Sequence, residues 1–412
     1  AVAPVDSATL GRFLPRWHGV GDESKGAHRL MESLVQLEGL VIPWSVLDRV
    51  LLPARVSEYR GEDLDMLAAT GEVVWVGRGA LGPRDGRVAL YRRERVGALH
   101  DREPDDEPPS DVHRLLLEHL RERGACFLVE LSQALERSGL QAGRQEFEAA
   151  LWDLVWAGLI TNDTFAPLRN LAGRTRQHGR GSALAGGRWS LVTDLLAEVS
   201  DTERLLARAQ MLLERYGVVS RAAVQAEGVR GGFGPLYRVL KQMEEGGRVR
   251  RGYFVEGLLG AQFAMPGVVD RLRGSRIEEM PVAGYSDGEV SLLAAIDPAN
   301  PYGALLPWPA VGGGTPPKRN SGSWVVLVAG KPILYLSAGG RQLATFPTSL
   351  TEEGGELALA LSRLHALPRA GKRRLLIQTV DGESALTSPL RESILSAGFE
   401  PDYDALAQVR WG

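Results

Sequence analysis

One spacing recurs three times along the chain and limits how it can fold. Two apolar residues lie three positions apart, a Gly follows four positions later, and a β-branched residue comes two positions after the Gly. The copies are Leu64-Leu67-Gly71-Val73, Leu151-Leu154-Gly158-Ile160 and Leu240-Met243-Gly247-Val249, and their first leucines lie 87 and 89 residues apart. This layout is typical of an amphipathic helix that ends at a glycine and is followed at once by a strand.

Further helical periodicity precedes these copies, at 111–124, 202–217 and 218–229. Several helices followed by a β-hairpin make a winged helix. We therefore predict a lead-in segment and three tandem winged-helix units, here called the first, second and third units. Their predicted ranges are 1–27 for the lead-in, then 28–110, 111–195 and 196–283. A helical solenoid is the alternative, but the repeat is long for one and the β-stretches do not fit it.

The pattern of predicted elements changes after residue 284. Strand-like runs occur at 323–330, 331–340, 341–346 and 373–380, with one helical pattern at 351–367. The predicted fold class is α+β, with tandem winged-helix domains followed by a small β-barrel-like domain over 284–412. A Pro/Gly-rich loop at 297–320 carries Tyr302 and Trp308, which we expect to be exposed anchors that make self-association plausible.

Composition excludes several classes of protein. The 412 residues carry a net charge of −3 and a single cysteine, Cys126, so intramolecular disulfides and cysteine zinc sites are excluded and a reducing cytoplasm is expected. No apolar run is long enough to span a membrane, and no secretion signal is evident. We expect no membrane partner, no metal and no cofactor. The chain starts without Met, which suggests a fragment of a larger protein.

Positive charge is concentrated in a few places. Residues 164–193 contain no acidic residue, and a second basic cluster begins at Arg248. Arginine and lysine on a recognition helix or wing neutralise phosphates, and we expect contacts to the DNA backbone (single- or double-stranded) without a base code. The alternative is a solvated charged face. The candidate DNA-binding residues are Arg78, Arg84, Arg87, Arg174, Arg176, Arg180, Arg238, Lys241, Arg248, Arg250 and Arg251.

Other motif matches are better explained by structure. The stretch GRGALG (77–82) fits the dinucleotide fingerprint, but a turn and a strand follow it where that fingerprint needs a helix, so we assign it to a wing. The stretch GYSDG (284–288) lacks the strand that a nucleophile elbow requires. No phosphate-binding GxxxxGK[ST] loop occurs. His113 and His119 have the wrong spacing to share a metal on a helix. Trp152 and Trp156 are interpreted as core residues.

Several long stretches resemble the C-terminal region of Lhr-type (large helicase-related) bacterial proteins. They include RFLPRWHGVG (12–21), GEVVWVG (71–77), ALWDLVWAGLITNDTFAPLRNL (150–171) and DPANPYGALLPWP (297–309). The resemblance implies a DNA-associated module linked to DNA repair. It also implies an ATP-driven N-terminal motor in the full-length chain, which this piece lacks.

The stretch LMESLVQLEG (30–39) carries a second resemblance. The C-terminal region of these helicases is similar to AlkZ-type winged-helix DNA glycosylases, which have a Gln-apolar-Gln or Gln-apolar-Asp motif near the start of their fold. Here Gln36-Leu37-Glu38 lies at that place, with Glu at the second polar position. The resemblance implies catalytic roles for Gln36 and Glu38. A carboxylate can stabilise an oxocarbenium-like sugar and activate water.

The two side chains converge only in extended backbone, because alternate residues of a helix point about 200° apart. The catalytic hypothesis therefore predicts that the helix ends before Gln36, and otherwise both residues are expected at the surface. Three functions stay open: a DNA-binding module of an Lhr-type helicase, a monofunctional DNA glycosylase, and a module that forms homo-oligomers.

Overall fold

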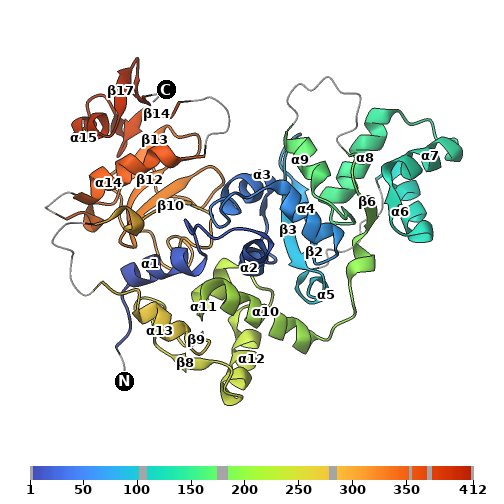
Figure 1. The fold of residues 1–412 in the computed structure, drawn as a ribbon, viewed down its shortest axis with the longest axis horizontal. Helices are drawn as coiled ribbons and strands as arrows, with labels where there is room; N and C mark the ends of the chain where they lie inside the picture. Colours follow the sequence, from blue (N-terminus) through green and yellow to red (C-terminus); the bar gives the residue numbers. More distant parts are fainter. Residues whose placement is uncertain are drawn as a thin grey trace. The chain divides into compact units, whose positions relative to one another are not determined.

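The computed structural model describes residues 3–101, 109–173, 184–277, 285–351, 355–368 and 374–409 (Figure 1). The chain divides into two compact units, one of residues 22–211 and one of residues 1–21 with 212–412, which we call the terminal unit. Within the described residues, no helix is long and apolar enough to cross a membrane.

The 22–211 unit holds two successive helix-and-hairpin modules. The first comprises α2 (Ala27–Leu37), β1 (Ile42–Pro43), α3 (Trp44–Val46), the π-helical turn η1 (Leu47–Leu51), α4 (Gly61–Ala69), β2 (Val73–Ala80), β3 (Gly86–Arg92) and α5 (Val96–Leu99). The second comprises α6 (Asp111–Arg123), β4 (Cys126–Phe127), α7 (Leu128–Ser138), α8 (Arg144–Trp156), β5 (Ile160–Asn162), α9 (Ala166–Ala172), β6 (Arg188–Leu191) and the 3₁₀ turn η2 (Val192–Leu195).

The third module begins with α10 (Asp201–Tyr216), and the rest of it lies in the terminal unit. It continues with β7 (Val218–Val219), α11 (Arg221–Ala226), α12 (Phe233–Glu245), β8 (Arg250–Gly252), β9 (Gln262–Ala264) and α13 (Val268–Arg273). The helix α1 (Ser7–Trp17) also belongs to the terminal unit.

The predicted repeat is confirmed at each copy. Its six apolar helix residues are all at most 6% exposed, and each Gly has a positive φ of 71–78°. The residue after each Gly donates its amide to the carbonyl five positions back, as in Glu72→Leu67, Leu159→Leu154 and Arg248→Met243 (2.8–3.0 Å). These bonds satisfy the last helical carbonyls and turn the chain directly into the strand.

Each module closes its strands in the same order. The sheets are β1-β3-β2, β4-β6-β5 and β7-β9-β8, all antiparallel, so that a short strand between helices pairs with the returning strand of the hairpin. This is the winged-helix topology that the spacing predicts. The GRGALG stretch lies in β2 and the turn before β3, as the wing assignment requires.

The C-terminal part is mixed α+β. Its strands are β10 (Val290–Ala294), β11 (Trp324–Val328), β12 (Lys331–Leu336), β13 (Gln342–Thr345), β14 (Leu376–Ile377), β15 (Thr379–Val380), β16 (Glu383–Ser384), β17 (Phe399–Asp402) and β18 (Ala405–Gln408). Its helical elements are η3 (Asp287–Glu289), η4 (Pro347–Ser349), α14 (Gly355–Arg363), η5 (Leu364–Ala366) and α15 (Arg391–Ser396).

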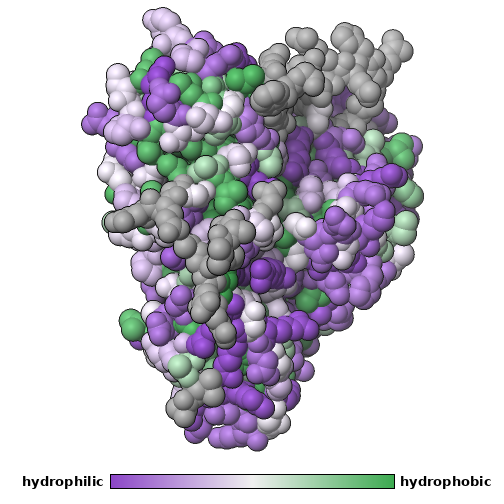
Figure 2. Space-filling model, turned by 60° about the vertical axis from the view of Figure 1, so that its left-hand side comes forward, coloured by the Kyte–Doolittle hydropathy of each residue, from purple (hydrophilic) through white to green (hydrophobic). Residues whose placement is uncertain are grey.

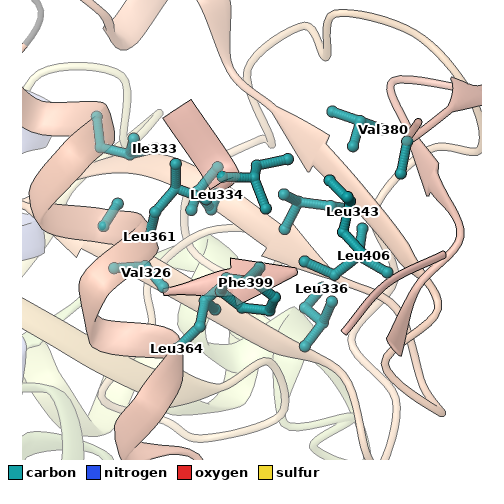
Figure 3. Packing of buried hydrophobic residues seen from close by; sticks show 14 of the residues in the cluster. Val326, Ile333, Leu334, Leu336, Leu343, Leu361, Leu364, Val380, Phe399 and Leu406 are labelled. Atoms are coloured by element: carbon teal, nitrogen blue, oxygen red, sulfur yellow. The ribbon is translucent and has the colours of Figure 1, made fainter. Parts of the chain in front are cut away.

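The barrel prediction is not borne out. The strands form an open sheet, β10-β11-β12-β13-β15-β16, beside a separate sheet, β14-β18-β17, and in the described part of the chain the two ends of the larger sheet do not pair. The run at 373–380 divides into β14 and β15, which join different sheets. Figure 3 shows Leu361 of α14 and Leu364 of η5 directed at strand residues such as Val326, and together they form the core of this part.

Helix α1 is fastened to the C-terminal part. Arg12 donates from Nε to the carbonyl of Ser275 and from Nη1 to that of Ala329, both at 2.6 Å. A Cβ placed on Gly11 would lie 2.0 Å from the carbonyl oxygen of Gly330, so glycine permits this close approach. Residues 1–21 of the lead-in segment are therefore part of the terminal unit.

The expectation that Tyr302 is exposed is wrong. Tyr302 is 4% exposed, donates its hydroxyl to the carbonyl of Gly330 (2.8 Å) and stacks with the half-buried Trp308 at 6.2 Å between ring centroids. The loop is thus an internal anchor and offers no aromatic face for self-association. On the face drawn in Figure 2, hydrophilic residues predominate and apolar residues form only small patches.

Candidate nucleic-acid interface and carboxylate centres

The structure contradicts the expected helix end at the Gln36-Leu37-Glu38 motif. Helix α2 continues through Gln36 to Leu37, and Glu38 is the first residue with extended backbone (φ −56°, ψ 128°). The amide of Gly39 donates to the carbonyl of Leu90 on β3 at 2.7 Å. The chain therefore leaves the helix two residues later than the catalytic hypothesis requires, because pairing with β3 sets the exit.

The side chain of Glu38 is buried, which differs from the surface position expected if the helix continues past Gln36. This side chain is 1% exposed, and Arg92 pairs with it through Nη2 at 2.7 Å and through Nε at 3.2 Å to both carboxylate oxygens. The amide of Arg92 donates to Oε1 at 2.8 Å, and Arg95 Nε lies 3.4 Å from Oε2. The carboxylate thus ties the end of α2 to the end of β3.

Gln36 is half-buried, with its Oε1 atom fully buried. The catalytic roles of Gln36 and Glu38 remain predictions, and the geometry restricts them. Glu38 can act on a substrate only if Arg92 and Arg95 release its carboxylate or themselves contact the substrate together with it. A buried carboxylate bonded to two guanidinium groups and an amide is, first of all, a structural ion pair.

A second carboxylate in the 22–211 unit was missed by the sequence reasoning. Asp48 lies on the π-helical turn η1 and accepts a hydrogen bond from the hydroxyl of Tyr59 at 2.9 Å. Burial raises the pKa of Asp48, while the Tyr59 hydrogen bond and the positive charges of Arg169 and Arg49 act in the opposite direction. Single-turn π-helices occur frequently at functional sites.

Asp48 lies where the first two modules meet. Asp65 on α4 pairs with Arg169 on α9 and accepts the amide of Phe165 at 2.7 Å. Arg169 also donates to the carbonyl of Gly61 at 3.1 Å. The centre therefore combines a half-buried carboxylate of raised pKa, a hydroxyl group and a guanidinium group, a combination suited to general acid–base chemistry.

No sequence signal singled out Asp48. It is one acidic residue in a helical pattern, and a 3.6-residue periodicity gives no sign of a π-helical turn. Only the folded chain brings it to Tyr59, eleven positions away, and to the charge of Arg169.

The third wing presents the clearest basic surface. Arg238 and Lys241 lie on α12, Arg250 and Arg251 lie on β8, Arg248 lies in the turn between them, and all five are exposed. Arg251 pairs with Glu244 at 3.2 Å and Lys241 with Glu245 at 3.8 Å. Among the described residues, no ion pair engages Arg238, Arg248 or Arg250. Three charges on one helix and wing are thus available to a phosphate.

A buried glutamine holds this wing in shape. Gln262 on β9 is fully buried, accepts the amides of Phe254 and Val255 at 2.9 Å, and donates to the carbonyls of Val255 and Leu258 at 2.8 and 2.9 Å. Tyr253 and Leu259 stay exposed at 51% and 81%. The loop between β8 and β9 is therefore anchored from inside, while Tyr253 and Leu259 face solvent.

The candidate DNA-binding residues of the first wing differ in their exposure. Arg84 and Arg87 are exposed and make no ion pair within the described part of the chain. Arg78 is half-buried and donates to the carbonyl of Asp101 at 2.9 Å, so part of its hydrogen-bonding capacity serves the fold. Arg174, Arg176 and Arg180 lie outside the described residues.

Two other arginines of the second module, Arg169 and Arg188, form ion pairs. In addition to the Arg169–Asp65 pair, Arg188 pairs with Asp163 at 2.8 Å. Trp152 and Trp156 stack at 5.3 Å and are half-buried, and a Cβ on Gly86 of the first wing would lie 2.3 Å from the ring of Trp156. These tryptophans pack the first wing against α8.

Metal-binding clusters are not found among the residues that the structure describes. His113 is buried, with Nδ1 at 2.8 Å from the hydroxyl of Ser110 and Nε2 at 3.4 Å from Asp153. This histidine is held within the second module, in agreement with a structural interpretation.

Comparisons with known proteins agree with the winged-helix assignment. Residues 5–93 and residues 198–283 each match a family model described as large helicase-related protein, winged-helix domain.

Two curated relatives match nearly the whole chain. A protein of Mycolicibacterium smegmatis named "Lhr helicase/ probable uracil glycosylase" is 36% identical over 430 residues, which cover 96% of this chain and 28% of the relative. A protein of Escherichia coli K12 named "Lhr helicase/uracil glycosylase" is 35% identical over 442 residues, which cover 100% of this chain and 28% of the relative. The chain thus spans little more than a quarter of each relative.

Among solved structures, the Streptomyces sahachiroi DNA glycosylase AlkZ aligns with a TM-score of 0.46 and 12% sequence identity. The alignment covers 89% of this chain and 98% of that one.

Proposed function

The chain is homologous to the C-terminal region of Lhr helicase/uracil glycosylases, and on that premise we propose that it is a DNA-binding module that holds the phosphate backbone through its winged-helix domains. The observation that carries the proposal is the basic surface of the third wing, where Arg238, Arg248 and Arg250 are exposed and make no ion pair with any described residue. An ATP-driven motor elsewhere in the full-length protein would be its partner.

Backbone contacts fit this surface better than base reading does. Arginine and lysine supply charge and hydrogen-bond donors for phosphate, whereas base reading needs matched donors and acceptors placed in a groove. The net charge of −3 means that attraction to DNA must come from the wing and not from the whole molecule. We therefore expect similar affinity for DNA of different sequences.

The test is the dependence of affinity on salt. Arg248→Ala with Arg250→Ala should weaken binding to every duplex alike and reduce the slope of log K against log salt by about 2, since each phosphate contact contributes about 0.9. Arg121→Ala with Arg123→Ala is the matched control, because these two exposed arginines lie at the end of α6, outside the third wing. Unchanged affinity and slope in the wing variant, or absent binding at low salt, would sink the proposal.

We propose as a second candidate function that the 22–211 unit excises a damaged base. Both curated relatives carry uracil glycosylase in their names, which makes uracil the first base to test. In such a reaction the bond from C1′ to the base breaks, water forms a new bond to C1′ and loses a proton, and the base leaves with one. A carboxylate near C1′ stabilises the cationic sugar and takes the proton from water.

Two carboxylates compete for that role. Glu38 occupies the position that the glycosylase resemblance implies, but its ion pair with Arg92 occupies both oxygens. Asp48 is half-buried, and burial favours its protonated form. A raised pKa makes a carboxyl group a better proton acceptor when ionised.

Release of uracil from single- and double-stranded DNA, without ATP or metal, tests the activity, and two variants assign the carboxylate. Asp48→Asn keeps an acceptor for Tyr59, and Glu38→Gln keeps an acceptor for the Arg92 amide. The variant that loses release by a hundredfold or more, while retaining DNA binding and a cooperative thermal transition above the assay temperature, identifies the essential group. Absence of release by the unmodified chain would remove this function, and full activity in both variants would remove both residues.

A module that forms homo-oligomers was the third hypothesis. Its support from exposed Tyr302 is lost, because that side chain is buried. Light scattering on the purified chain would test it directly.

A further inference from the structure

A pocket in the C-terminal part has a chemistry that neither proposed function uses. It has a volume of about 580 Å³ and lies between the loop that precedes β11 and the edge formed by β12, β13 and β15. Fifteen residues line it, including two cations, Lys318 and Arg341, and no aspartate or glutamate. A lining of this kind favours an anion, and the volume is within the range of small-molecule sites.

Both cations are available. Lys318 and Arg341 are exposed, and neither forms an ion pair with any residue that the structure describes. The other polar side chains of the lining are neutral hydrogen-bonding groups, among them Thr315, Asn320 and Gln342. The pocket therefore joins two positive charges with donors and acceptors suited to a polar ligand.

The wall that carries Lys318 is firmly held. The amide of Lys318 donates to the hydroxyl of Tyr335 at 3.1 Å, and the amide of Gly312 donates to the carbonyl of Thr345 at 3.0 Å. Arg319, next to Lys318, donates to the carbonyls of Asn300 at 2.7 Å and Tyr302 at 3.0 Å. A loop fixed at these points holds the backbone of Lys318 in place before a ligand arrives, which lowers the entropic cost of binding.

The opposite turn is built for close approach to this loop. Asp381 has a φ of 52°, and its carboxylate accepts both the amide and the hydroxyl of Thr345 at 2.8 Å. A Cβ on Gly313 would lie 2.3 Å from the carbonyl oxygen of Asp381. Within the described chain, the amides of Gly313 and Gly314 donate no hydrogen bond. Free amides of consecutive residues in a glycine-rich loop are suited to phosphate oxygens.

We propose that this pocket binds the phosphate of a nucleotide unit through Lys318 and Arg341. The phosphate can belong to a free nucleotide or to a nucleic-acid strand, and the two sources share the chemistry that the pocket recognises. The site is separate from the winged-helix wings and does not depend on either proposed function.

Calorimetry on the full 412-residue chain at low salt tests the site with three probes: deoxythymidine monophosphate, deoxythymidine and a 5′-phosphorylated oligonucleotide of four thymidines. We expect the monophosphate or the oligonucleotide to bind and deoxythymidine to bind at least tenfold more weakly. Lys318→Ala with Arg341→Ala should weaken binding at least tenfold. Arg391→Ala, an arginine of the same part that does not line the pocket, should bind as the unmodified chain does.

Binding of the monophosphate alone identifies a free nucleotide as the ligand, and binding of the oligonucleotide alone identifies a strand. Equal binding of deoxythymidine, unchanged binding in the double variant, or no binding of either phosphate probe would overturn the proposal. The double variant should keep the salt slope for duplex DNA that the third wing sets, so failure here is distinguishable from failure of the wing.

Discussion

The ion pair between Glu38 and Arg92 makes a quantitative prediction about stability. Glu38→Ala removes a carboxylate whose side chain is 1% exposed. The side chains of Arg92 and Arg95, which are 20% and 14% exposed, then lose this ion-pair partner. Breaking a buried ion pair from one side costs about 3–5 kcal/mol. Because both arginines keep some access to water, we expect the low end, a loss of about 3 kcal/mol in the free energy of unfolding.

Glu38→Gln should cost less. A glutamine oxygen can still accept the amide of Arg92, which now bonds to Oε1 at 2.8 Å, but the charge is gone. Hydrogen bonds to charged groups contribute about 1.5–3 kcal/mol and neutral ones about 1 kcal/mol, so a loss of about 0.5–2 kcal/mol follows. A double-mutant cycle with Arg92→Ala should give a coupling of about 2 kcal/mol between the two side chains.

Urea denaturation followed by tryptophan fluorescence measures these changes, because Trp44 and Trp75 are fully buried in the same unit. Glu32→Ala is the control, since that helix residue has a 53% exposed side chain and should change stability by less than about 0.5 kcal/mol. A loss below about 1 kcal/mol in Glu38→Ala would refute the structural role. It would also leave any loss of base release in Glu38→Gln attributable to chemistry.

Three further predictions concern other buried features. Burial raises the pKa of Asp48, so ionisation of this carboxyl at pH 7 opposes folding. The Asp48→Asn variant should therefore have a melting temperature at pH 7 no lower than that of the unmodified chain. Any stability that the variant gains at pH 7 should be lost near pH 3, below the ordinary Asp pKa of about 3.9. Gln262→Leu should cost about 2–4 kcal/mol and speed amide exchange in 253–261, because it leaves four buried backbone groups unpaired; unchanged exchange would contradict the anchoring role. Gly11→Ala should cost about 3 kcal/mol by thermal melting, because its Cβ meets a carbonyl at 2.0 Å. Gly234→Ala, in open space in the first turn of α12, should cost almost nothing, and equal effects would contradict the packing argument.

The winged-helix repeat could be predicted because its causes are local. An apolar pair three positions apart buries one face of a helix, and a Gly with positive φ lets the next amides close the helix end. The same bonds recur at Glu72, Leu159 and Arg248, so each copy carries the information for its own turn. The basic third wing could be predicted for the same reason, since wing and helix are neighbours in sequence.

Whether the C-terminal strands close into a barrel could not be predicted from local sequence pattern. The run 373–380 has the composition of one strand, yet Ile377 pairs with Leu406 and Thr379 pairs with Gln342. Strand partners are chosen by long-range packing, and composition carries little of that information. The burial of Tyr302 was missed likewise, because its partner Gly330 lies 28 positions away.

By itself, the sequence determined the helix-and-hairpin modules, the positions of their glycine stops, and the exposed charges of the third wing. Tertiary structure decided the state of each carboxylate. Glu38 is an ion pair because β3 brings Arg92 to the end of α2, across 54 positions of sequence. Asp48 has a raised pKa because packing removes water from a π-helical turn. Burial and pairing depend on which distant segments meet, and these two quantities control what a charged group can do.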